Sequence, residues 1–240
     1  MTRTNIMAVD RRVRLRPRDG AEGYVYGDDA SEGPVRPGLL SILRTTNGMI
    51  WPTTPTINVS QAANYESTQP THSVAAYNTF ENTANTTITV AGEFHVGNAS
   101  EAYYLLASIH FLRTLTKMDF GRSSSTRGTP PPVMLFSAYG SYMFNDIPVV
   151  VKNTNFEFRN DVDYIQVPIQ ATDSFGFYGT EGTKDTFFDS FIKKDDKVWV
   201  PQVMNINVSL EQQPTASYVT NDFNLNEFKK GKLLLKGGFI

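Results

Sequence analysis

The stretch Val203-Met-Asn-Ile-Asn-Val-Ser-Leu210 shows the clearest alternation of apolar and polar side chains in this chain. Successive side chains of a strand point to opposite faces, so a period of two predicts a strand with one buried face. The residues expected on that face are Met204, Ile206, Val208 and Leu210. Pro201 lies shortly before them and favours a sheet edge or a bulge, because proline cannot donate to a strand ladder.

A second segment with the same period is Thr86–Val96, which places Ile88, Val90, Phe94 and Val96 on one face. The segment Ser73–Phe80 precedes it, and the polar residues 81–85 between the two predict a turn and therefore a hairpin. Further strands are expected at Val133–Phe136, at Ile147–Lys152 and Asn155–Phe158 (as a pair or as one bent strand), and at Asp163–Ile169.

Residues 98–118 have the period of a helix instead. Their apolar side chains recur at spacings of three and four and form one stripe, namely Ala102, Leu105, Leu106, Ile109, Leu112 and Leu115. Asn98 or Ser100 can cap the first backbone donors, and with Asn98 as the cap Glu101 takes the position of a capping-box carboxylate. The Phe-rich and Gly-rich residues 171–197 predict an excursion from the sheet, with a short helix at 185–192.

These elements predict a mainly β fold with one long helix (α+β), as a β-sandwich or partly closed barrel with the helix on its flank. We divide the chain into a basic N-terminal arm and loop at 1–48, a β domain at 49–215, and a C-terminal extension at 216–240. Six arginines in the first 18 residues predict either an arm docked on a neighbour or a solvated tail. A strand is also compatible with this segment, because Val13 and Leu15 alternate with arginines.

The composition excludes several classes of function. The 240-residue chain has no cysteine, which excludes disulfides, thiolate catalysis and cysteine-ligated metal sites. Its net charge of −2 argues against a protein that binds nucleic acid over its whole surface. No apolar run approaches the roughly 18 residues of a membrane span, and no secretory signal is visible, so we expect no membrane segment.

A search for catalytic or binding motifs gives no candidate. His72, His95 and His110 lack the spacing of metal ligands, and neither a phosphate-binding glycine loop nor a nucleophile elbow occurs. Asp161 and Asp163 would share one face of a strand and could share a proton, but a solvated strand end explains the same pattern. We therefore predict no catalytic, cofactor-binding or metal-binding residue and no enzymatic activity.

Five segments follow one another in a characteristic order and spacing. They are Tyr103–Gly121, Gly128–Gly140, Phe144–Val151, Asp161–Tyr164 and Trp199–Pro201. In this order they resemble the baseplate tail-tube proteins of contractile-tailed bacteriophages, and most of all the tube initiators at the junction of baseplate and tube. The resemblance spans roughly residues 48–215, and the chain is shorter than the larger initiators.

The resemblance implies a tail-tube β-barrel or sandwich fold and a structural role in the virion. It also implies a six-fold ring of copies that nucleates the tail tube, with the tail-tube protein, baseplate hub proteins and the tape-measure protein as partners. Phage DNA would pass through the lumen without specific binding, and the protein would occupy the host cytoplasm only during assembly. Two alternatives stay open: a bulk tail-tube or secretion-tube subunit and, more remotely, a baseplate-associated cell-wall hydrolase.

Three regions are candidates for contacts with neighbouring subunits: the arm 1–38, the loop 121–132 and the excursion 171–197. Arginine and aromatic side chains are enriched in protein interfaces, and these regions contain several. The candidate assembly contacts are Arg12, Arg14, Arg122, Arg127, Pro131, Phe175, Phe177, Phe188 and Phe191. The alternative for each region is an ordinary surface loop.

Overall fold

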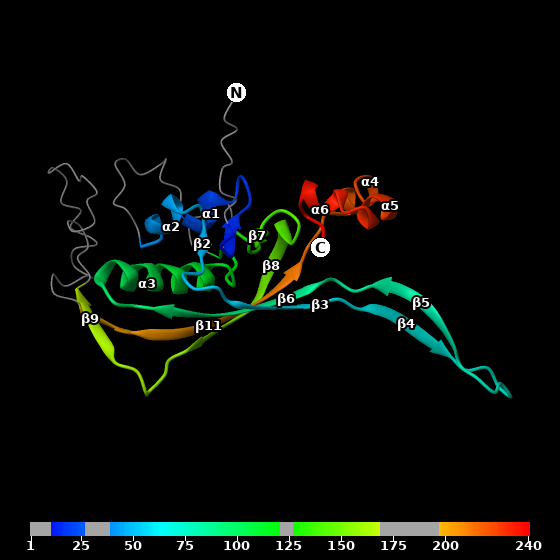
Figure 1. The fold of residues 1–240 in the computed structure, drawn as a ribbon, viewed down its shortest axis with the longest axis horizontal. Helices are drawn as coiled ribbons and strands as arrows, with labels where there is room; N and C mark the ends of the chain where they lie inside the picture. Colours follow the sequence, from blue (N-terminus) through cyan, green and yellow to red (C-terminus); the bar gives the residue numbers. More distant parts are fainter. Residues whose placement is uncertain (1–10, 27–38, 121–126, 169–196) are drawn as a thin grey trace, which may run out of the picture.

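The computed structural model describes residues 11–26, 39–120, 127–168 and 197–240, and it is mainly β (Figure 1). The strands are β1 (Arg14–Pro17), β2 (Met49–Ile50), β3 (Thr56–Ser60), β4 (Ala63–Thr68), β5 (Tyr77–Thr83), β6 (Thr87–His95), β7 (Met134–Ala138), β8 (Phe144–Glu157), β9 (Tyr164–Pro168), β10 (Lys197–Pro201) and β11 (Val203–Gln212). The helices are α1 (Glu22–Tyr26), α2 (Ser41–Thr45), α3 (Ala99–Thr114), α4 (Ala216–Asn221), α5 (Leu225–Lys229) and α6 (Lys232–Lys236). The predicted short helix at 185–192 lies outside the described residues.

The central element is an antiparallel sheet of seven strands in the order β2-β1-β7-β8-β11-β6-β3. Its edges β2 and β3 do not pair with each other, so the described residues form an open sheet and neither a closed barrel nor a two-sheet sandwich. The helix α3 and the N-terminal segment cover the apolar face, and this is why no second sheet is needed there. Figure 1 shows β1, β2 and β7 standing above β6 and β11, on the side of α3.

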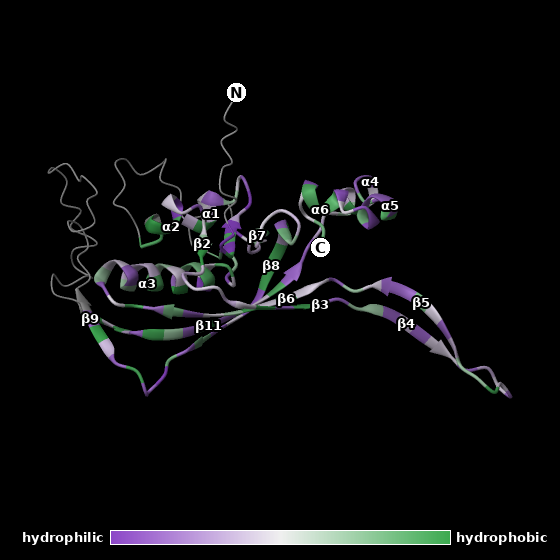
Figure 2. Cartoon of the chain, viewed as in Figure 1, coloured by the Kyte–Doolittle hydropathy of each residue, from purple (hydrophilic) through white to green (hydrophobic). Residues whose placement is uncertain are grey.

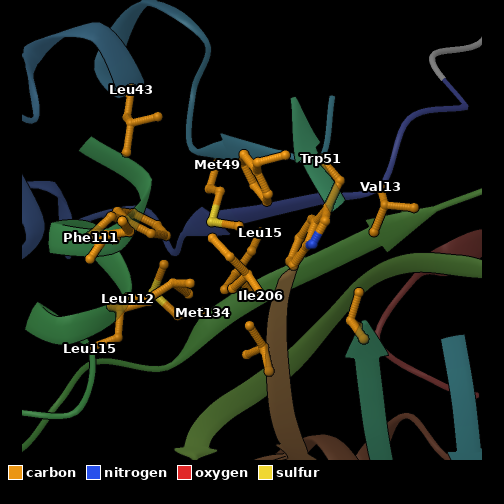
Figure 3. Close-up of a cluster of buried hydrophobic side chains, with 14 of the residues drawn as sticks. Val13, Leu15, Leu43, Met49, Trp51, Phe111, Leu112, Leu115, Met134 and Ile206 are labelled. Atoms are coloured by element: carbon orange, nitrogen blue, oxygen red, sulfur yellow. The ribbon is translucent and has the colours of Figure 1, made fainter. Parts of the chain in front are cut away.

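One hydrophobic cluster joins the sheet to α3 (Figure 3). Leu15 of β1, Met134 of β7 and Ile206 of β11 are fully buried and belong to the same cluster as Phe111 and Leu112 of α3. The apolar faces predicted for β6 and β11 are confirmed. The side chains of Ile88, Val90, Phe94, Val96, Met204, Ile206, Val208 and Leu210 are all buried.

The described part of the N-terminal segment belongs to this body. β1 pairs with β2 on one side and β7 on the other, and Val13 and Leu15 are buried in the core. Of the alternatives left open for this segment, the strand predicted from the alternation of Val13 and Leu15 is therefore confirmed at Arg14–Pro17, and for these residues the free arm or tail is wrong. Residues 1–10 and 27–38 lie outside the described residues, and the domain boundaries at 48 and 215 stay predictions.

A polar contact also ties β1 to β8. Nη2 of Arg16 donates to Oδ2 of Asp146 at 3.0 Å, and the Ser137 hydroxyl donates to Oδ1 of Asp146 at 2.7 Å. Asp146 has a φ of 48°, in the left-handed region that aspartate tolerates better than most residues. Burial raises the pKa of Asp146, but the hydrogen bonds from Arg16 and Ser137 outweigh it and hold this pKa below its ordinary value.

The start of α3 is as predicted. Oδ1 of Asn98 accepts a hydrogen bond of 2.9 Å from the Glu101 amide, and Oε2 of Glu101 accepts one of 2.7 Å from the Gly97 amide. The helix ends at Thr114, four residues before the predicted end. Thr114 and Thr116 donate their hydroxyls to the carbonyls of His110 and Arg113, a local bonding pattern that competes with helix continuation.

The prediction of one long helix over residues 98–118 needs a correction. The described residues contain six helices: α3 has 16 residues, and the other five have five or six residues each. Helices of one or two turns are too short for their apolar period to stand out in a sequence, which explains why they were missed.

The predicted hairpin with a turn at 81–85 is wrong. β5 pairs with β4, whereas β6 pairs with β3 and β11, so β5 continues into β6 along one direction. The Ala84 amide donates to the Ala62 carbonyl at 2.9 Å and joins the two halves of one long hairpin. Its inner half, β3 and β6, lies in the sheet. Its outer half, β4 and β5, extends away from the rest of the molecule (Figure 1).

A second long hairpin is formed by β8 and β9 on one side and β10 and β11 on the other. Pro201 is the last residue of β10, and Gln202 separates it from β11, which confirms the irregularity predicted there. The Gln202 amide donates to the Asp163 carbonyl at 2.9 Å and keeps the two parts of the hairpin together.

The C-terminal helices are attached to the start of β8. The Gly238 amide donates to the Asn145 carbonyl at 2.8 Å, and Nδ2 of Asn145 donates to the Leu235 carbonyl at 3.1 Å. The Tyr218 and Phe239 rings stack with centroids 4.4 Å apart. The C-terminal extension therefore ends in an ordered helical layer and not in a loose tail.

Candidate assembly surfaces

The most exposed element is the outer hairpin, which we call the projecting hairpin and define as β4, β5 and their connection (residues 63–83). All six residues of β4 and all seven of β5 are exposed. An isolated two-stranded ribbon is marginally stable in water, because it has no apolar layer to bury. The projecting hairpin is thus an element for which the described chain supplies no covering partner.

One face of the projecting hairpin carries an aromatic pair. Tyr65 and Phe80 lie directly opposite each other in the register, and their rings meet edge to face with centroids 5.6 Å apart. Their exposed fractions are 60% and 54%. Val74 in the connection and Tyr77 on β5 are also exposed. Large exposed side chains of this kind are typical anchors of protein interfaces.

The charges of the projecting hairpin are few and of one sign. Glu66 and Glu81 are its only charged residues, and no lysine or arginine occurs between Arg44 and Arg113. Figure 2 shows the mostly polar composition of its two strands. Exposed strand edges are usually protected by lysine or proline, yet β4 and β5 contain neither. Glu66, Glu81 and the register shift after Asn64 are the features that limit pairing of this ribbon with another chain.

A second exposed surface lies on the C-terminal helices, and we call it the C-terminal patch. Its apolar members are Val219, Phe223, Leu225 and Leu235, each between 43% and 55% exposed. Its basic members are Lys229, Lys230, Lys232 and Lys236, which are all exposed. Asp222 and Glu227 lie on the same helices and are outnumbered by the four lysines, so the patch combines apolar area with a net positive charge, the opposite of the acidic projecting hairpin.

The sheet face opposite α3 carries an open groove of ≈ 570 Å³. Thr53, Glu93, Asn155, Glu157 and Asn205 are among its lining residues, and none of the lining residues is a lysine or arginine. Nδ2 of Asn205 donates to Oε2 of Glu157 at 2.9 Å, and the Thr53 hydroxyl donates to the Glu93 carbonyl at 2.7 Å. Such a lining can hold water or a polar partner by hydrogen bonds and has no lysine or arginine to bind phosphates.

The structure describes four of the nine predicted contact residues. Arg12 is exposed, and Arg14 is half-buried in β1, where it lies opposite Ile50 and Ser137. Arg127 is exposed, with its guanidinium 4.7 Å from the centre of the Phe120 ring, and Pro131 is half-buried. The other five lie outside the described residues: Arg122, Phe175, Phe177, Phe188 and Phe191.

Asp161, one of the two carboxylates considered as an acid–base pair with Asp163, forms an ion pair with Arg159. Nε of Arg159 donates to Oδ1 of Asp161 at 2.8 Å, and this hydrogen bond lowers the pKa of Asp161. A proton shared between two carboxylates requires the opposite shift, a raised pKa, in one of them.

The histidine on α3 gives no sign of a metal or catalytic site. Burial lowers the pKa of His110. In the described ranges no group of three or more His, Asp or Glu side chains is placed to hold a metal ion.

Sequence reasoning missed the two surfaces that the structure brings out most clearly. One feature of the sequence does distinguish the projecting hairpin: it lies within the long stretch between Arg44 and Arg113 that contains no lysine or arginine. Trp199 on β10 is another omission, since 61% of it is exposed. Exposure of single aromatic residues in strands cannot be read from a sequence, because the same pattern fits either face of a sheet.

Comparison with known proteins adds no relative. The sequence matches no protein-family model and no curated protein. Among the helices of the described residues, none is both long and apolar enough to pass through a membrane.

Proposed function

We propose that this chain is a structural virion protein that forms a ring at the baseplate of a contractile-tailed phage. The ring nucleates the tail tube and links it to the baseplate hub, and the protein performs no catalysis. The observation that carries an assembly role is the projecting hairpin, whose strands β4 and β5 are exposed along their whole length. Its place in the baseplate rests on the resemblance described above.

The open sheet supports the same proposal. β3 is an edge strand, whereas at the other edge the Ile50 amide and carbonyl of β2 are hydrogen-bonded to the Tyr104 hydroxyl. Contacts that repeat head to tail by rotation close into a ring. Because α3 already covers the apolar face of the sheet within one copy, neighbouring copies would meet at strand edges and at the projecting hairpin. The tail-tube protein, the hub proteins and the tape-measure protein are the further partners in this proposal.

The polar groove on the sheet face fits a wall along which DNA moves freely. Its lining contains Glu93 and Glu157 and no lysine or arginine. Because DNA affinity depends on the number of phosphates that cations neutralise, such a surface would bind DNA weakly. In this proposal the protein resides in the virion tail and is present in the host cytoplasm during assembly.

Negative-stain electron microscopy of the purified chain, alone and with the tail-tube subunit, tests the proposal. We expect single rings or monomers alone, and tubes that begin at rings when the tube subunit is added. Long tubes from the chain alone would identify a bulk tube subunit. Absence of rings and of tube nucleation under both conditions would contradict the proposal. Peptidoglycan hydrolysis that Asp163→Asn abolishes would indicate the hydrolase alternative.

A further inference from the structure

We propose that the projecting hairpin of one copy docks on the C-terminal patch of a second copy of this chain. This inference rests on the proposed function, since it names the surfaces through which copies of the subunit would meet. The first argument is energetic. Strands β4 and β5 bury no residue against their own chain, so a stable conformation of this ribbon requires a covering surface.

The second argument is the shape and polarity of the two surfaces. Tyr65 and Phe80 form an aromatic ridge on one face of the ribbon, with both rings more than half exposed. The C-terminal patch offers exposed apolar side chains, of which Phe223 lies between α4 and α5 and Leu225 is the first residue of α5. Packing of aromatic anchors against apolar side chains would remove both sets from water.

The charges of the two surfaces indicate that the projecting hairpin of a second copy occupies the C-terminal patch. Glu66 and Glu81 lie on the ribbon, and four lysines between residues 229 and 236 lie on the patch. In the part of the chain that the structure describes, no ion pair involves either glutamate or any of these lysines. Opposite net charges on two surfaces orient them and raise their association rate. The same chain therefore carries both halves of one complementary contact.

The contact is repeated and directional. The ribbon and the patch are different surfaces, so the contact is heterologous. In a pair, one copy keeps its patch free and the other keeps its ribbon free, and further copies can bind at both ends. Rotation about an axis would close such a series into a ring. Conversely, a two-fold dimer would need the ribbon of each copy to reach the patch of the other at once.

Disulfide trapping tests the contact directly, because the natural chain has no cysteine. One full-length chain carries Ser67→Cys on the ribbon, and a second chain with a tag of different size carries Asn226→Cys on α5. Each chain has a single thiol, so every disulfide joins two chains. The control replaces Asn226→Cys by Asn160→Cys, an exposed position in the loop between β8 and β9 and away from the C-terminal helices (Figure 1).

We expect the ribbon–patch heterodimer to form at least ~10-fold faster than the ribbon–loop control, because proximity raises the effective concentration of the two thiols. Equal rates for the two pairs would overturn the inference. So would a ribbon that is trapped chiefly against another ribbon in a mixture of the two chains.

Charge reversal provides a second variant that spares the aromatic pair and the fold. Glu66→Lys with Glu81→Lys should weaken self-association measured by sedimentation at least ~5-fold, and Lys229→Glu with Lys232→Glu on the same chain should restore it. No change in either variant would overturn the inference. If the wild-type chain forms rings while both tests fail, only this contact is wrong; if trapping succeeds but no ring or tube forms, the proposed function is wrong and the contact stands.

Discussion

The inner and outer halves of the first long hairpin are made by the same two chain segments, yet they have opposite surroundings. In β6 the apolar residues Ile88, Val90 and Phe94 are buried, whereas in β5 all seven residues are exposed. The backbone runs from one half to the other with a ladder hydrogen bond at Ala84. The difference is that β6 has β11 as a further neighbour, and the same sheet face packs against α3.

This contrast shows that pairing and burial are separate requirements. β4 and β5 pair as regularly as β3 and β6, apart from one register shift after Asn64. Hydrogen bonds between two strands satisfy the backbone but contribute little net stability in water, because water makes the same bonds with the unfolded chain. Most of the stabilisation of a strand comes from the apolar face that a further layer covers.

Two phenylalanines on these halves give the largest expected difference. Phe94→Ala removes a side chain that is 2% exposed and should lower the free energy of unfolding by ~3–5 kcal/mol. Phe80→Ala removes one that is 54% exposed and should lower it by less than ~1 kcal/mol. Urea denaturation at low protein concentration, followed by the fluorescence of the buried Trp51, measures both. Similar losses would show that the outer half is covered within a single copy.

A smaller effect is expected from Gly92 on β6. A Cβ at this position would lie 2.5 Å from Cδ1 of Trp51 and 2.9 Å from Cβ of Pro55, so Gly92→Ala must displace the indole ring. We expect a loss of ~1–3 kcal/mol in the free energy of unfolding and a changed Trp51 emission. Gly97→Ala is the matched control, since its Cβ would meet no heavy atom closer than 3.5 Å. Equal effects of the two substitutions would contradict this packing.

The smallest effect concerns the stability of the protein in acid. Here a carboxylate of the seven-stranded sheet, Asp146 on β8, is compared with one on the projecting hairpin. The pKa of Asp146 is lower in the folded state than in the unfolded chain. Its contribution to stability is therefore complete above the unfolded pKa of ~3.9 and is lost as the pH falls through the lower folded pKa. The Asp146 side chain is 43% exposed, so solvent screening limits the contribution to less than ~1 kcal/mol.

Asp146→Asn should therefore make the stability of the protein less dependent on pH below ~4, as measured by urea denaturation at a series of pH values. Asparagine also tolerates the positive φ at this position, so the backbone need not change. Glu66→Gln on the projecting hairpin is the control, because it removes one carboxylate outside the Arg16–Asp146 contact. An unchanged acid limb in Asp146→Asn would show that the Arg16 contact does not stabilise the fold.

Much of the local structure could be predicted from the sequence. The buried faces of β6 and β11 follow from their period of two, and the start of α3 follows from Asn98 and Glu101. These features depend on residues within one or two turns, or within one strand, and short-range physics determines them. The five short helices and the end of α3 were missed because terminal turns depend on competing hydrogen bonds of single Thr side chains and on tertiary contacts.

The candidate surfaces were harder to predict, because the exposure of a side chain depends on tertiary contacts. The composition indicated basic ends, but it did not distinguish Arg14, half-buried in a strand, from the exposed lysines of the C-terminal patch. The projecting hairpin was expected as half of a different hairpin, because residues 81–85 have the composition of a turn. Asn and Thr are common in turns, yet they also fit an exposed strand whose side chains all face water.

The sequence by itself determined the strands that have a buried face, such as β6 and β11, the apolar faces of these strands, and the residue at which the main helix begins. Only the tertiary structure decided which strands are neighbours, since backbone hydrogen bonds are the same for every residue and do not specify a distant partner. It also decided that β3 and β6 lie in the sheet while β4 and β5 extend beyond it. The physical reason is that burial depends on a third strand and a helix that other parts of the chain supply.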